Sequence, residues 1–493
     1  MRKLGVIGMV LAWTAATVPA WAAPVDLTIL HTNDTHDHLL PYETRQGKDL
    51  GGIARRATLI TQIKGNTERV LVLDAGDTFQ GTPLFNFFSG EPDYLTMDQA
   101  GYDATTVGNH DLDNGLENLK KQAAGRRFKL ISTNLLDPKT GKPIFVGTHV
   151  FERGGLKVGV FGVLGFNALG AVAKENQKDF KFVSPIKVAE ETAAELRKRS
   201  DLVVMLSHSG LDEDTELAGK VKGIDVIVGG HSHTKLDQPR EVMNGDWRTL
   251  VVQGFQWGEY VGKLDLKVDG GKVVAYEGKL MPVTKEIADD QTVAATVKAY
   301  NDKIAERMAV IIGSAPKGLS AEGKYKKDSE LGNWTADVMR ERGKAEIGIM
   351  NAGGLRAALQ PGSITVGDVF TIFPFDNALV TIDVDGATLK GFIDKAAAIP
   401  GRAAQLQYSG VTFAVAGGKA SDIRVNGTPL DTKRFYKVAT IDYLAQGNDG
   451  YEAFANGKNY QATGKVLRDV IIEAITARPT LIPPATGRIR VAN

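Results

Sequence analysis

RVLVLDAGD, residues 69–77, is the stretch that decides which fold this chain is expected to adopt. Four apolar residues, from Val70 to Leu73, lead directly into two acidic residues separated by Ala-Gly. A short continuous apolar run is typical of a strand buried on both faces, as in a parallel sheet. Ligand-binding side chains follow the carboxyl ends of such strands. The stretch therefore predicts a layered α/β structure with Asp77 at a strand-end site.

The same succession of apolar run and polar loop recurs through the N-terminal half of the chain. The further runs read DLTILHT before NDTHDHL, DATTVGN before HDLDNG, DLVVMLSHSG, and IDVIVGGHSH. Residues 51–64 and 185–199 have helical spacing, and residues 156–163 and 263–274 have the pattern of strands. These alternations predict an α/β domain over residues 25–285, built of two sheets with outer helices.

The pattern of the sequence changes after residue 285. Residues 286–310 lack strong strand signals and contain good helix formers, which predicts one exposed interdomain helix. Residues 330–343 have helical spacing, and strand-like runs such as EIGIM, ALVTIDV and VTFAV follow. We therefore predict a second α/β (α+β) domain over residues 311–493.

The composition limits the classes of function. The chain has 493 residues, of which 43% are hydrophobic and 24% charged, and its formal net charge is +1. The length predicts two domains, and the balanced charge argues against a nucleic-acid-binding protein, which usually carries a basic excess. The absence of cysteine excludes disulfides, thiolate metal sites and a cysteine nucleophile. Any metal must therefore be bound by oxygen atoms and imidazole nitrogens.

The N-terminus has the pattern of a secretory signal. A basic start, RK, precedes an apolar run over residues 4–18, and AWA at residues 20–22 fits a cleavage site. The run is short for a membrane span, although an uncleaved anchor is the alternative. The pattern predicts a signal peptide over residues 1–22 and a periplasmic or secreted protein without a membrane segment after cleavage.

Side chains that can bind metals are concentrated after five of the predicted strands. Five of the eight histidines belong to this set, whereas a single histidine at a strand end would more often be structural. The set comprises Asp34, His36, Asp77, Asn109, His110, His208, His231 and His233. Carboxylate, amide and imidazole ligands suit Zn²⁺, Mn²⁺, Fe or Co better than Mg²⁺ or Ca²⁺.

The number of ligands exceeds what one catalytic metal with an open position needs. Two metals about 3.5–4 Å apart would use them, polarise a phosphoryl group and activate water. Asp77 is the expected bridge between them, because it lies in a Gly-Asp turn after a buried strand. The spacings Asp34-Thr-His36 and His231-Ser-His233 would place both members of each pair on one side of an extended segment.

Within VGNHDLDNG, residues 107–115, neighbouring side chains are expected to point in different directions. Asn109 would face a metal, and His110 would face the substrate. Asp113 could accept a hydrogen bond from one ring nitrogen of His110 and leave the other to bind a phosphoryl oxygen or to protonate the leaving group. The alternative is that Asp113 only caps a helix. Asp111 is expected to be structural or to support the ligands.

A second group of polar and aromatic residues lies in the C-terminal half. NAGGLR, FPFDN and YLAQGNDGY combine chain-turning residues with side chains that could contact a nucleotide. Arginine can bind phosphate through two parallel hydrogen bonds, and aromatic rings from separate loops can sandwich a base. The same residue types are common in cores and turns. The candidates are Asn351, Arg356, Phe375, Asn377, Tyr443 and Asp449.

The ordered motifs of the N-terminal half resemble those of calcineurin-like metallophosphoesterases. They are Asp34-Thr-His36, Gly76-Asp77-Thr-Phe-Gln-Gly81, Gly108-Asn109-His110-Asp111, Ser207-His208 and Gly229-Gly230-His231-Ser-His233. With the second half included, residues 25–490 resemble the secreted 5′-nucleotidase family, which includes ecto-5′-nucleotidase and bacterial UDP-sugar hydrolase.

The resemblance implies a dinuclear phosphohydrolase whose second domain binds the nucleotide and whose domains rotate to open and close a cleft. It implies one metal held by Asp34, His36 and His233, another held by Asn109, His208 and His231, Asp77 between them, and a His110–Asp113 dyad. It further implies base stacking by Phe375 and Tyr443, base contact by Asn351, phosphate contact by Arg356 and ribose contact by Asp449, with Asn377 as an additional contact.

Two positions depart from the family pattern. His233 stands where the best-known members have an amide side chain, which leaves the metal preference open. The stretch KYKKDSELGN, residues 324–333, contains Lys324, Lys326 and Lys327 but lacks a phosphate-binding arginine that relatives carry there. A lysine supplies charge without a planar fork, so the preference among phosphate esters also stays open.

The sequence thus predicts a secreted enzyme with two divalent metal ions, Zn²⁺ or Mn²⁺, that releases phosphate from nucleoside 5′-monophosphates. The same centre could instead serve a 2′,3′-cyclic nucleotide phosphodiesterase or a UDP-sugar hydrolase. A binding protein with structural metals is the alternative from another class, and the neutral charge disfavours a nuclease. The expected partner is a nucleotide small molecule, not a nucleic acid or a membrane, and no oligomeric state is predicted.

Overall fold

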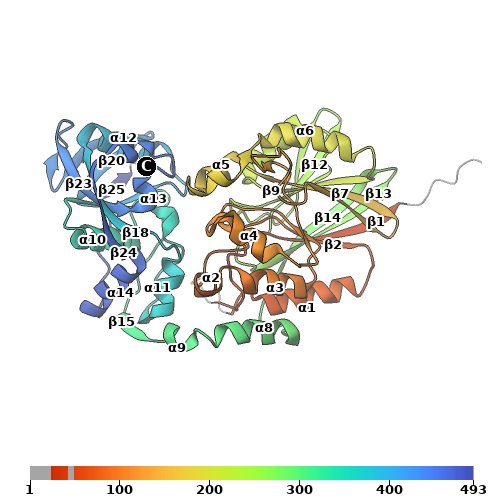
Figure 1. Ribbon diagram of the computed structural model, residues 1–493, viewed down its shortest axis with the longest axis horizontal. Coiled ribbons are helices and arrows are strands. Elements are labelled where there is room, and N and C mark those ends of the chain that lie inside the picture. The colour runs from red at the N-terminus through yellow and green to blue at the C-terminus, as the bar shows by residue number, and fades with distance from the viewer. Residues whose placement is uncertain (1–23, 43–48, 492–493) are drawn as a thin grey trace, which may run out of the picture.

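The computed structural model describes residues 24–42 and 49–491 of the chain. The predicted signal peptide, residues 1–22, lies outside these described residues. Among the described helices, none is long and apolar enough to cross a bilayer. The N-terminal and C-terminal halves lie side by side, and two short helices run along one edge from the first to the second (Figure 1).

Two six-stranded sheets form the framework of the N-terminal half. Their strand orders are β14-β13-β1-β2-β3-β4 and β11-β12-β10-β9-β7-β6. The first comprises β1 (Val25–Thr32), β2 (Val70–Asp74), β3 (Ala104–Thr105), β4 (Lys129–Leu130), β13 (Tyr260–Asp269) and β14 (Lys272–Pro282). The second comprises β6 (Thr148–Arg153), β7 (Leu156–Leu164), β9 (Leu202–His208), β10 (Val226–Gly229), β11 (Arg240–Asn244) and β12 (Trp247–Val252). A small pair, β5 (Leu135–Leu136) and β8 (Lys181–Phe182), lies apart from them.

The central strands of both sheets are parallel. β1, β2, β3 and β4 run in one direction in the first sheet, and β7, β9, β10 and β12 run together in the second. The remaining strands, β13 and β14 on one edge and β6 and β11 on the others, pair antiparallel. Parallel strands with this burial place their carboxyl ends along a common edge of each sheet.

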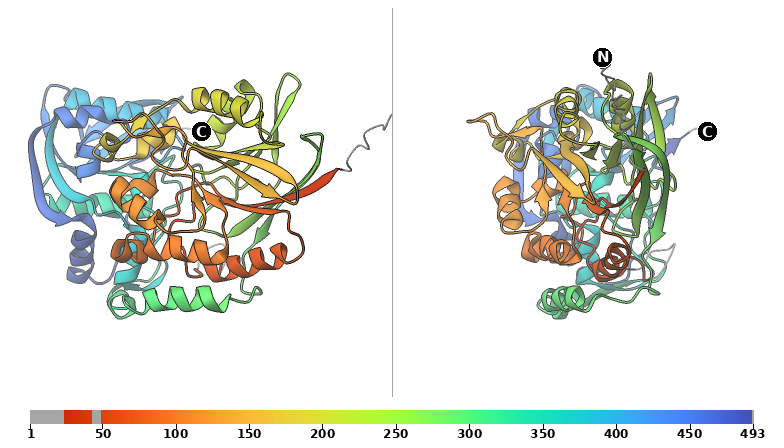
Figure 2. Two further views of the ribbon diagram at one scale, coloured as in Figure 1. Left: turned by 45° about the vertical axis from the view of Figure 1, so that its right-hand side comes forward. Right: turned by 90° about the vertical axis from the view of Figure 1, so that its right-hand side faces the viewer.

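Helices cover the outer face of each sheet, so that the half is a four-layer sandwich (Figure 2). In β2, Val70 and Val72 pack in the cluster beneath the helices, whereas Leu71 and Leu73 pack against the second sheet. This alternation explains the continuous apolar run, because both faces of the strand are buried. The helices are α1 (Ile53–Lys64), α2 (Pro83–Phe88), α3 (Glu91–Ala100), α4 (Gly115–Ala123), α5 (Phe166–Ala171), α6 (Pro185–Leu196) and α7 (Leu211–Lys220).

The connector is two helices, α8 (Gln291–Asn301) and α9 (Ala305–Met308), so the prediction of one helix over residues 286–310 is wrong in detail. The Asp290 side chain accepts hydrogen bonds from two backbone N–H groups of the first turn and begins α8 there. After α8, a tight turn from Asn301 to Ile304 interrupts the helix. Ile304 is buried in the core beneath the first sheet, which explains why the chain turns inward.

The C-terminal half has one core enclosed by a five-stranded sheet, a four-stranded sheet and helices. The five-stranded sheet has the order β19-β16-β23-β18-β24, with bounds β16 (Ile347–Asn351), β18 (Ala378–Asp385), β19 (Leu406–Ser409), β23 (Phe435–Ile441) and β24 (Lys458–Val466). The four-stranded sheet has the order β22-β21-β20-β25, with bounds β20 (Val411–Ala416), β21 (Lys419–Val425), β22 (Thr428–Pro429) and β25 (Ile489–Val491). β15 (Ile311–Ala315) pairs with β17 (Gly362–Thr365), and the helices are α10 (Glu330–Arg342), α11 (Val366–Ile372), α12 (Gly386–Ala398), α13 (Asp442–Ala445) and α14 (Leu467–Ala477).

The predicted fold class is confirmed: a two-sheet α/β layered half, a helical connector and a second mixed α/β half. The predicted helices at residues 51–64, 185–199 and 330–343 correspond to α1, α6 and α10. The loops that follow the parallel strands of the first half carry the residues that were expected to bind metals.

Candidate metal centre

Five strand ends from the two sheets converge on one place. In the first sheet, β1 leads into Asp34 and His36, β2 leads into Asp77, and β3 leads into Asn109. β9 of the second sheet ends on His208, and β10 leads into His231 and His233. All seven are the predicted metal-ligand residues, and the structure brings all seven together.

The charged and imidazole side chains form two adjoining groups. One group is Asp34, His36 and His233, and the other is Asp77, His208 and His231. Within each group the ligand atoms all lie within 4.8 Å of one another. Asn109 joins the second group, since its Oδ1 lies 3.2 Å from His208 Nε2 and 2.9 Å from His231 Nδ1.

Asp77 lies between the two groups. Its Oδ2 is 3.1 Å from Nε2 of His208 in one group and 3.8 Å from Nε2 of His36 in the other. The second oxygen, Oδ1, accepts a hydrogen bond of 2.7 Å from the backbone N–H of His110. A carboxylate in this position can serve both groups at once.

Backbone carbonyls fix the orientation of two imidazoles. His36 Nδ1 lies 2.9 Å from the carbonyl oxygen of Gln80, and His208 Nδ1 lies 2.7 Å from that of Ala75. A carbonyl only accepts, so both Nδ1 atoms carry the hydrogen, and in the neutral form of each ring Nε2 keeps a lone pair. This is the tautomer that a metal ligand needs, with an outer partner holding the ring.

The donor set fits divalent cations. His36 Nε2 and His233 Nε2 face each other at 3.1 Å, and His233 Nε2 is 3.4 Å from Asp34 Oδ1. The side chain of Gln256 contacts the other ring nitrogen of His233. Lone-pair atoms crowded at such distances in a buried place are stabilised by a shared cation, and this nitrogen and oxygen set suits a transition metal.

The carboxylates of the centre are held in the ionised form. Burial opposes charge on Asp77, but His208 and His110 keep its pKa well below the usual range. Burial would likewise lower the pKa of His208, yet the Asp77 and Asp34 carboxylates outweigh it and raise that pKa to about 10. The centre therefore concentrates negative charge that cationic groups neutralise.

The loops that carry these residues adopt left-handed backbone. Asp34 and His36 have φ of 50° and 47°, and His231 and His233 have φ of 73° and 50°. The expectation that each pair lies along an extended segment is therefore wrong, whereas His231 and His233 do belong to different groups, as the family resemblance implied. Non-glycine residues in this region cost about 1–3 kcal/mol each, and such strain persists where surrounding contacts impose it.

Asp111 imposes part of this geometry. Its carboxylate accepts hydrogen bonds of 2.8–3.2 Å from the backbone N–H groups of Asp77, Thr78, Phe79 and Gly108. The two loops approach so closely that a Cβ on Gly108 would lie 2.2 Å from Asp77 Oδ1. Asp111 is thus the structural support for the loop that holds Asp77, which agrees with the expectation for this residue.

His110 and Asp113 lie together on the cavity wall. His110 Nδ1 is 2.8 Å from Asp113 Oδ2, a hydrogen-bond distance. Burial opposes the imidazolium, but Asp113 and Asp77 together raise the pKa of His110. Asp113 is not the N-cap of α4, because Asn114 occupies that position; it instead ends the short 3-10 helix His110–Leu112.

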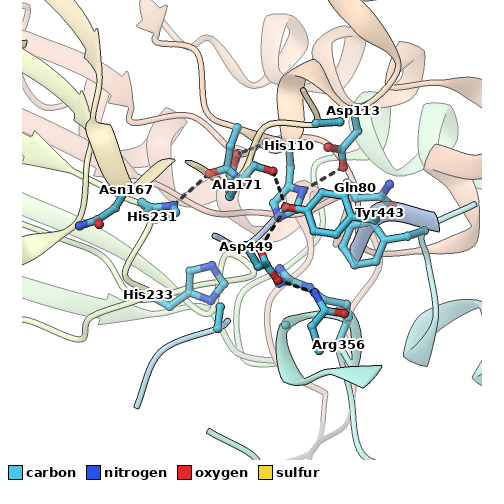
Figure 3. Close-up of a pocket in the computed structure, with 18 of the residues that line it drawn as sticks. Gln80, His110, Asp113, Asn167, Ala171, His231, His233, Arg356, Tyr443 and Asp449 are labelled. Atoms are coloured by element: carbon cyan, nitrogen blue, oxygen red, sulfur yellow. Dashed lines mark hydrogen bonds and ion pairs between the residues drawn. The ribbon is translucent and has the colours of Figure 1, made fainter. Parts of the chain in front are cut away.

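One cavity of about 710 Å³ joins the metal centre to the C-terminal half. Asp77, Asn109, His110, Asp113, His231 and His233 line it from the first half, and all six predicted substrate residues, Asn351, Arg356, Phe375, Asn377, Tyr443 and Asp449, line it from the second. Figure 3 shows Tyr443, Asp449 and Arg356 facing His110 and His233 across this space. Asp34, His36 and His208 lie behind the wall and are fully buried.

The predicted nucleoside contacts are linked to one another. Asp449 accepts hydrogen bonds from the Asn351 amide at 2.8 Å and from the Tyr443 hydroxyl at 3.0 Å. The Tyr443 hydroxyl also lies 3.2 Å from the carbonyl oxygen of Ala171 in the first half. The ring of Phe375 lies 5.5 Å from that of His110, tilted by 31°. An aromatic residue of the second half therefore packs directly against the His110–Asp113 pair.

Arg356 lies between the metal-binding groups of the first half and the aromatic residues of the second half. Its Nη2 lies 3.1 Å from His36 Nε2, and its guanidinium carbon lies 6.0 Å from the centre of the Phe375 ring. The guanidinium therefore extends from the aromatic wall to the metal-binding groups. A phosphate that reached the metal centre would meet this side chain.

Gln256 and Tyr325 are among the residues of the site that were not identified from the sequence. Gln256 contacts His233, and Tyr325 lines the cavity beside Arg356. Gln256 lies four residues after Val252, the end of the apolar run of β12, so the strand-end pattern could have indicated it, whereas Tyr325 lies between Lys324 and Lys326 with no apolar run before it. Tyr325 has no such local signal, because only the folding of distant segments brings it to the site.

Comparison with known proteins agrees with this geometry. A family model described as calcineurin-like phosphoesterase matches residues 27–235, and one described as 5′-nucleotidase, C-terminal domain, matches residues 308–456. The 5′-nucleotidase of Vibrio cholerae is 30% identical over 520 residues, which cover 94% of this chain and 93% of the relative. Protein UshA of Escherichia coli is 27% identical over 524 residues, which cover 94% of each chain.

A solved structure shares the whole architecture. The crystal structure of a 5′-nucleotidase precursor from Thermus thermophilus matches with a TM-score of 0.89 and 32% sequence identity. The match covers 95% of this chain and 100% of that one. Both halves and their arrangement are therefore common to the two proteins.

Proposed function

The chain belongs to the 5′-nucleotidase family of calcineurin-like phosphoesterases, and from this premise we propose that it releases phosphate from nucleoside 5′-monophosphates. The observation that supports this most is that one cavity is lined by residues of both halves. The two metal-binding groups form one end of it, and aromatic and amide side chains from the second half form the other. A mononucleotide has the same two parts, a phosphate and a base.

We propose that Asp34, His36 and His233 hold one divalent ion and that Asn109, His208 and His231 hold another, with Asp77 shared. Zn²⁺ and Mn²⁺ are the ions that this nitrogen and oxygen set favours. When bound, the pair supplies Lewis acidity toward phosphoryl oxygens and lowers the pKa of water. The His36 and His208 rings are already oriented by backbone carbonyls, which supports ligation through the lone pairs that remain.

In this proposal, Arg356 binds the phosphate and orients it. His110 keeps a proton on the ring nitrogen opposite Asp113 and donates it to a phosphoryl oxygen or to the departing 5′ oxygen. The Asp113 carboxylate holds the imidazole in place at 2.8 Å and favours its protonated form. Phe375 and Tyr443 bind the base between them, and Asn351, Asn377 and Asp449 contact the base and ribose.

The N-terminal sequence supports a role outside the cytoplasm. Residues 1–22 have the basic start, apolar run and small-residue site of a signal peptide. Export together with phosphate release from nucleotides fits the catabolism of external nucleotides in the periplasm or medium.

A substrate panel tests the proposal. We expect the purified protein, with Mn²⁺ or Zn²⁺, to release phosphate from AMP faster than it cleaves 2′,3′-cyclic AMP, UDP-glucose or ADP. Faster cleavage of the cyclic nucleotide or of UDP-glucose would replace the proposed activity with one of these alternatives, since the same centre could serve them.

The variant His110→Ala separates an enzyme from a binding protein. We expect it to lower kcat for AMP by about 10²–10⁴, the usual contribution of a positioned proton donor, with Tm and metal content unchanged. His149→Ala is the matched control, because His149 is a half-buried histidine of β6, outside the set of cavity-lining residues. Unchanged kcat in His110→Ala would contradict the assigned role.

A further inference from the structure

The lysine-rich segment after β15, residues 324–327, contains one lysine and one tyrosine that are partly buried. Lys326 and Lys327 are exposed, whereas Lys324 and Tyr325 are partly buried. Tyr325 lines the same cavity as Arg356. The fold therefore partly buries Lys324 and leaves Lys326 and Lys327 exposed, although the sequence pattern does not distinguish the three lysines.

Lys324 connects this segment to the neighbourhood of Arg356. Its ammonium nitrogen donates a hydrogen bond to the carbonyl oxygen of Leu355, the residue before Arg356. The same nitrogen lies 4.6 Å from the centre of the Tyr325 ring. This distance is within the range of a cation–π contact. Lys324 thus fixes the tyrosine ring relative to the arginine.

The backbone of the pair is also fixed. The carbonyl oxygen of Lys324 accepts a hydrogen bond of 2.9 Å from the buried Gln407 amide. The carbonyl oxygen of Tyr325 accepts one of 2.5 Å from the backbone N–H of Gly401. The position of the phenol in the cavity is therefore set by contacts to two other segments.

The surroundings of the phenol favour contact with an anion. Burial opposes ionisation of Tyr325, but Lys324 and Arg356 outweigh it and lower the pKa of the hydroxyl. The hydroxyl of the other cavity-lining tyrosine, Tyr443, is already engaged with Asp449 and Ala171. A phenol flanked by two cations is a strong hydrogen-bond donor to an anion.

We propose that Tyr325 donates a hydrogen bond to a substrate phosphoryl oxygen beside Arg356, and that Lys324 is the residue that positions it. The inference rests on the proposed function, because the ligand is the terminal phosphate of a nucleoside monophosphate. It assigns the contact to a phenol and an ammonium in a segment that contains no arginine between residues 316 and 339.

The variant Tyr325→Phe removes only the hydroxyl. We expect the KM for AMP and the inhibition constant of inorganic phosphate each to rise about 10- to 100-fold, as for loss of one hydrogen bond to a charged group. We expect kcat to change by less than about 3-fold and Tm to stay constant, since the ring and its contact with Lys324 remain. The exposed Lys326→Met is the matched control and should leave all four quantities unchanged.

A second pair of variants tests the positioning role of Lys324. Lys324→Met should raise the KM for AMP in the wild-type background but add little to Tyr325→Phe, because both act through one contact. Lys324→Arg, which keeps the charge, should recover most of the loss. Additive effects in the double variant would overturn the positioning role.

Calorimetric titration of the metal-loaded protein with inorganic phosphate keeps this test separate from the proposed function. Weaker phosphate binding by Tyr325→Phe supports the contact, and an unchanged dissociation constant overturns it. Wild-type protein that binds phosphate normally but does not hydrolyse AMP would instead overturn the proposed function, whatever the result for Tyr325.

Discussion

At the scale of single residues, two carboxylates of the candidate metal centre have different roles. Asp77 lies between two groups of imidazoles, with its Oδ2 3.1 Å from His208 Nε2. Asp111, which is completely buried, accepts hydrogen bonds from four backbone N–H groups. Asp111 therefore positions Asp77, since it holds the loop in which Asp77 adopts a φ of 53°.

The variant Asp111→Asn tests this support. An amide presents N–H groups where the carboxylate accepts, so buried backbone donors lose partners at a cost of about 1–3 kcal/mol. We expect a lower Tm and reduced retention of metal, measured by thermal unfolding and elemental analysis. Asp98→Asn is the control, because Asp98 also accepts a backbone N–H, from Arg127, but lies away from the centre. Equal metal content in Asp111→Asn and wild type would contradict the role.

The sequence predicted which residue types gather here but not how the loops hold them. The positions of Asp34, His36, Asp77 and His208 after apolar runs were enough to predict convergence, because parallel strands end at a common edge. Left-handed backbone and the four hydrogen bonds to Asp111 depend on contacts between loops that are distant in sequence. Tyr325 was missed for the same reason.

At the scale of elements, strand alternation was predictable and helix continuity was not. The run Val70 to Leu73 predicted burial on both faces, and its side chains do alternate between two cores. The connector contains good helix formers throughout, yet it breaks at Asn301–Ile304 where Ile304 enters the core. Tertiary burial of a single apolar residue outweighs helix propensity at this point.

The end of α5 and the segment after it contact the second half beside the cavity. Lys174 Nζ donates to the carbonyl oxygen of Gly447 at 3.0 Å, and the carbonyl of Ala171 lies 3.2 Å from the Tyr443 hydroxyl. Figure 1 shows α5 at the side of the first half that faces the second. Helix α13, which carries Tyr443, and the turn after it are therefore held against the first half by two polar contacts.

Removing one of these contacts should weaken nucleotide binding. We expect Lys174→Met to raise the KM for AMP about 3- to 10-fold with little change in kcat, because a partly exposed hydrogen bond from a charged donor contributes modestly. Steady-state kinetics measure the effect, and Lys178→Met, an exposed lysine four residues further along, provides the control. A KM equal to that of wild type would show that the contact does not influence the cavity.

At the scale of the whole molecule, neither half contains the complete site. The first half supplies the metal-binding groups and the His110–Asp113 pair, and the second supplies Arg356 and the aromatic residues. The sequence predicted two mixed α/β halves because periodicity changes along the chain. Local pattern alone could not predict that the two halves close on one cavity, since this depends on their surfaces; only the resemblance to the 5′-nucleotidase family implied a cleft between the domains.

Elemental analysis of active, purified protein tests the central claim most directly, because every role proposed here depends on a pair of cations joined by Asp77. We predict two divalent ions per chain in wild type and a loss of ions together with activity in Asp77→Asn. A fully active protein with one ion per chain or none would contradict the account.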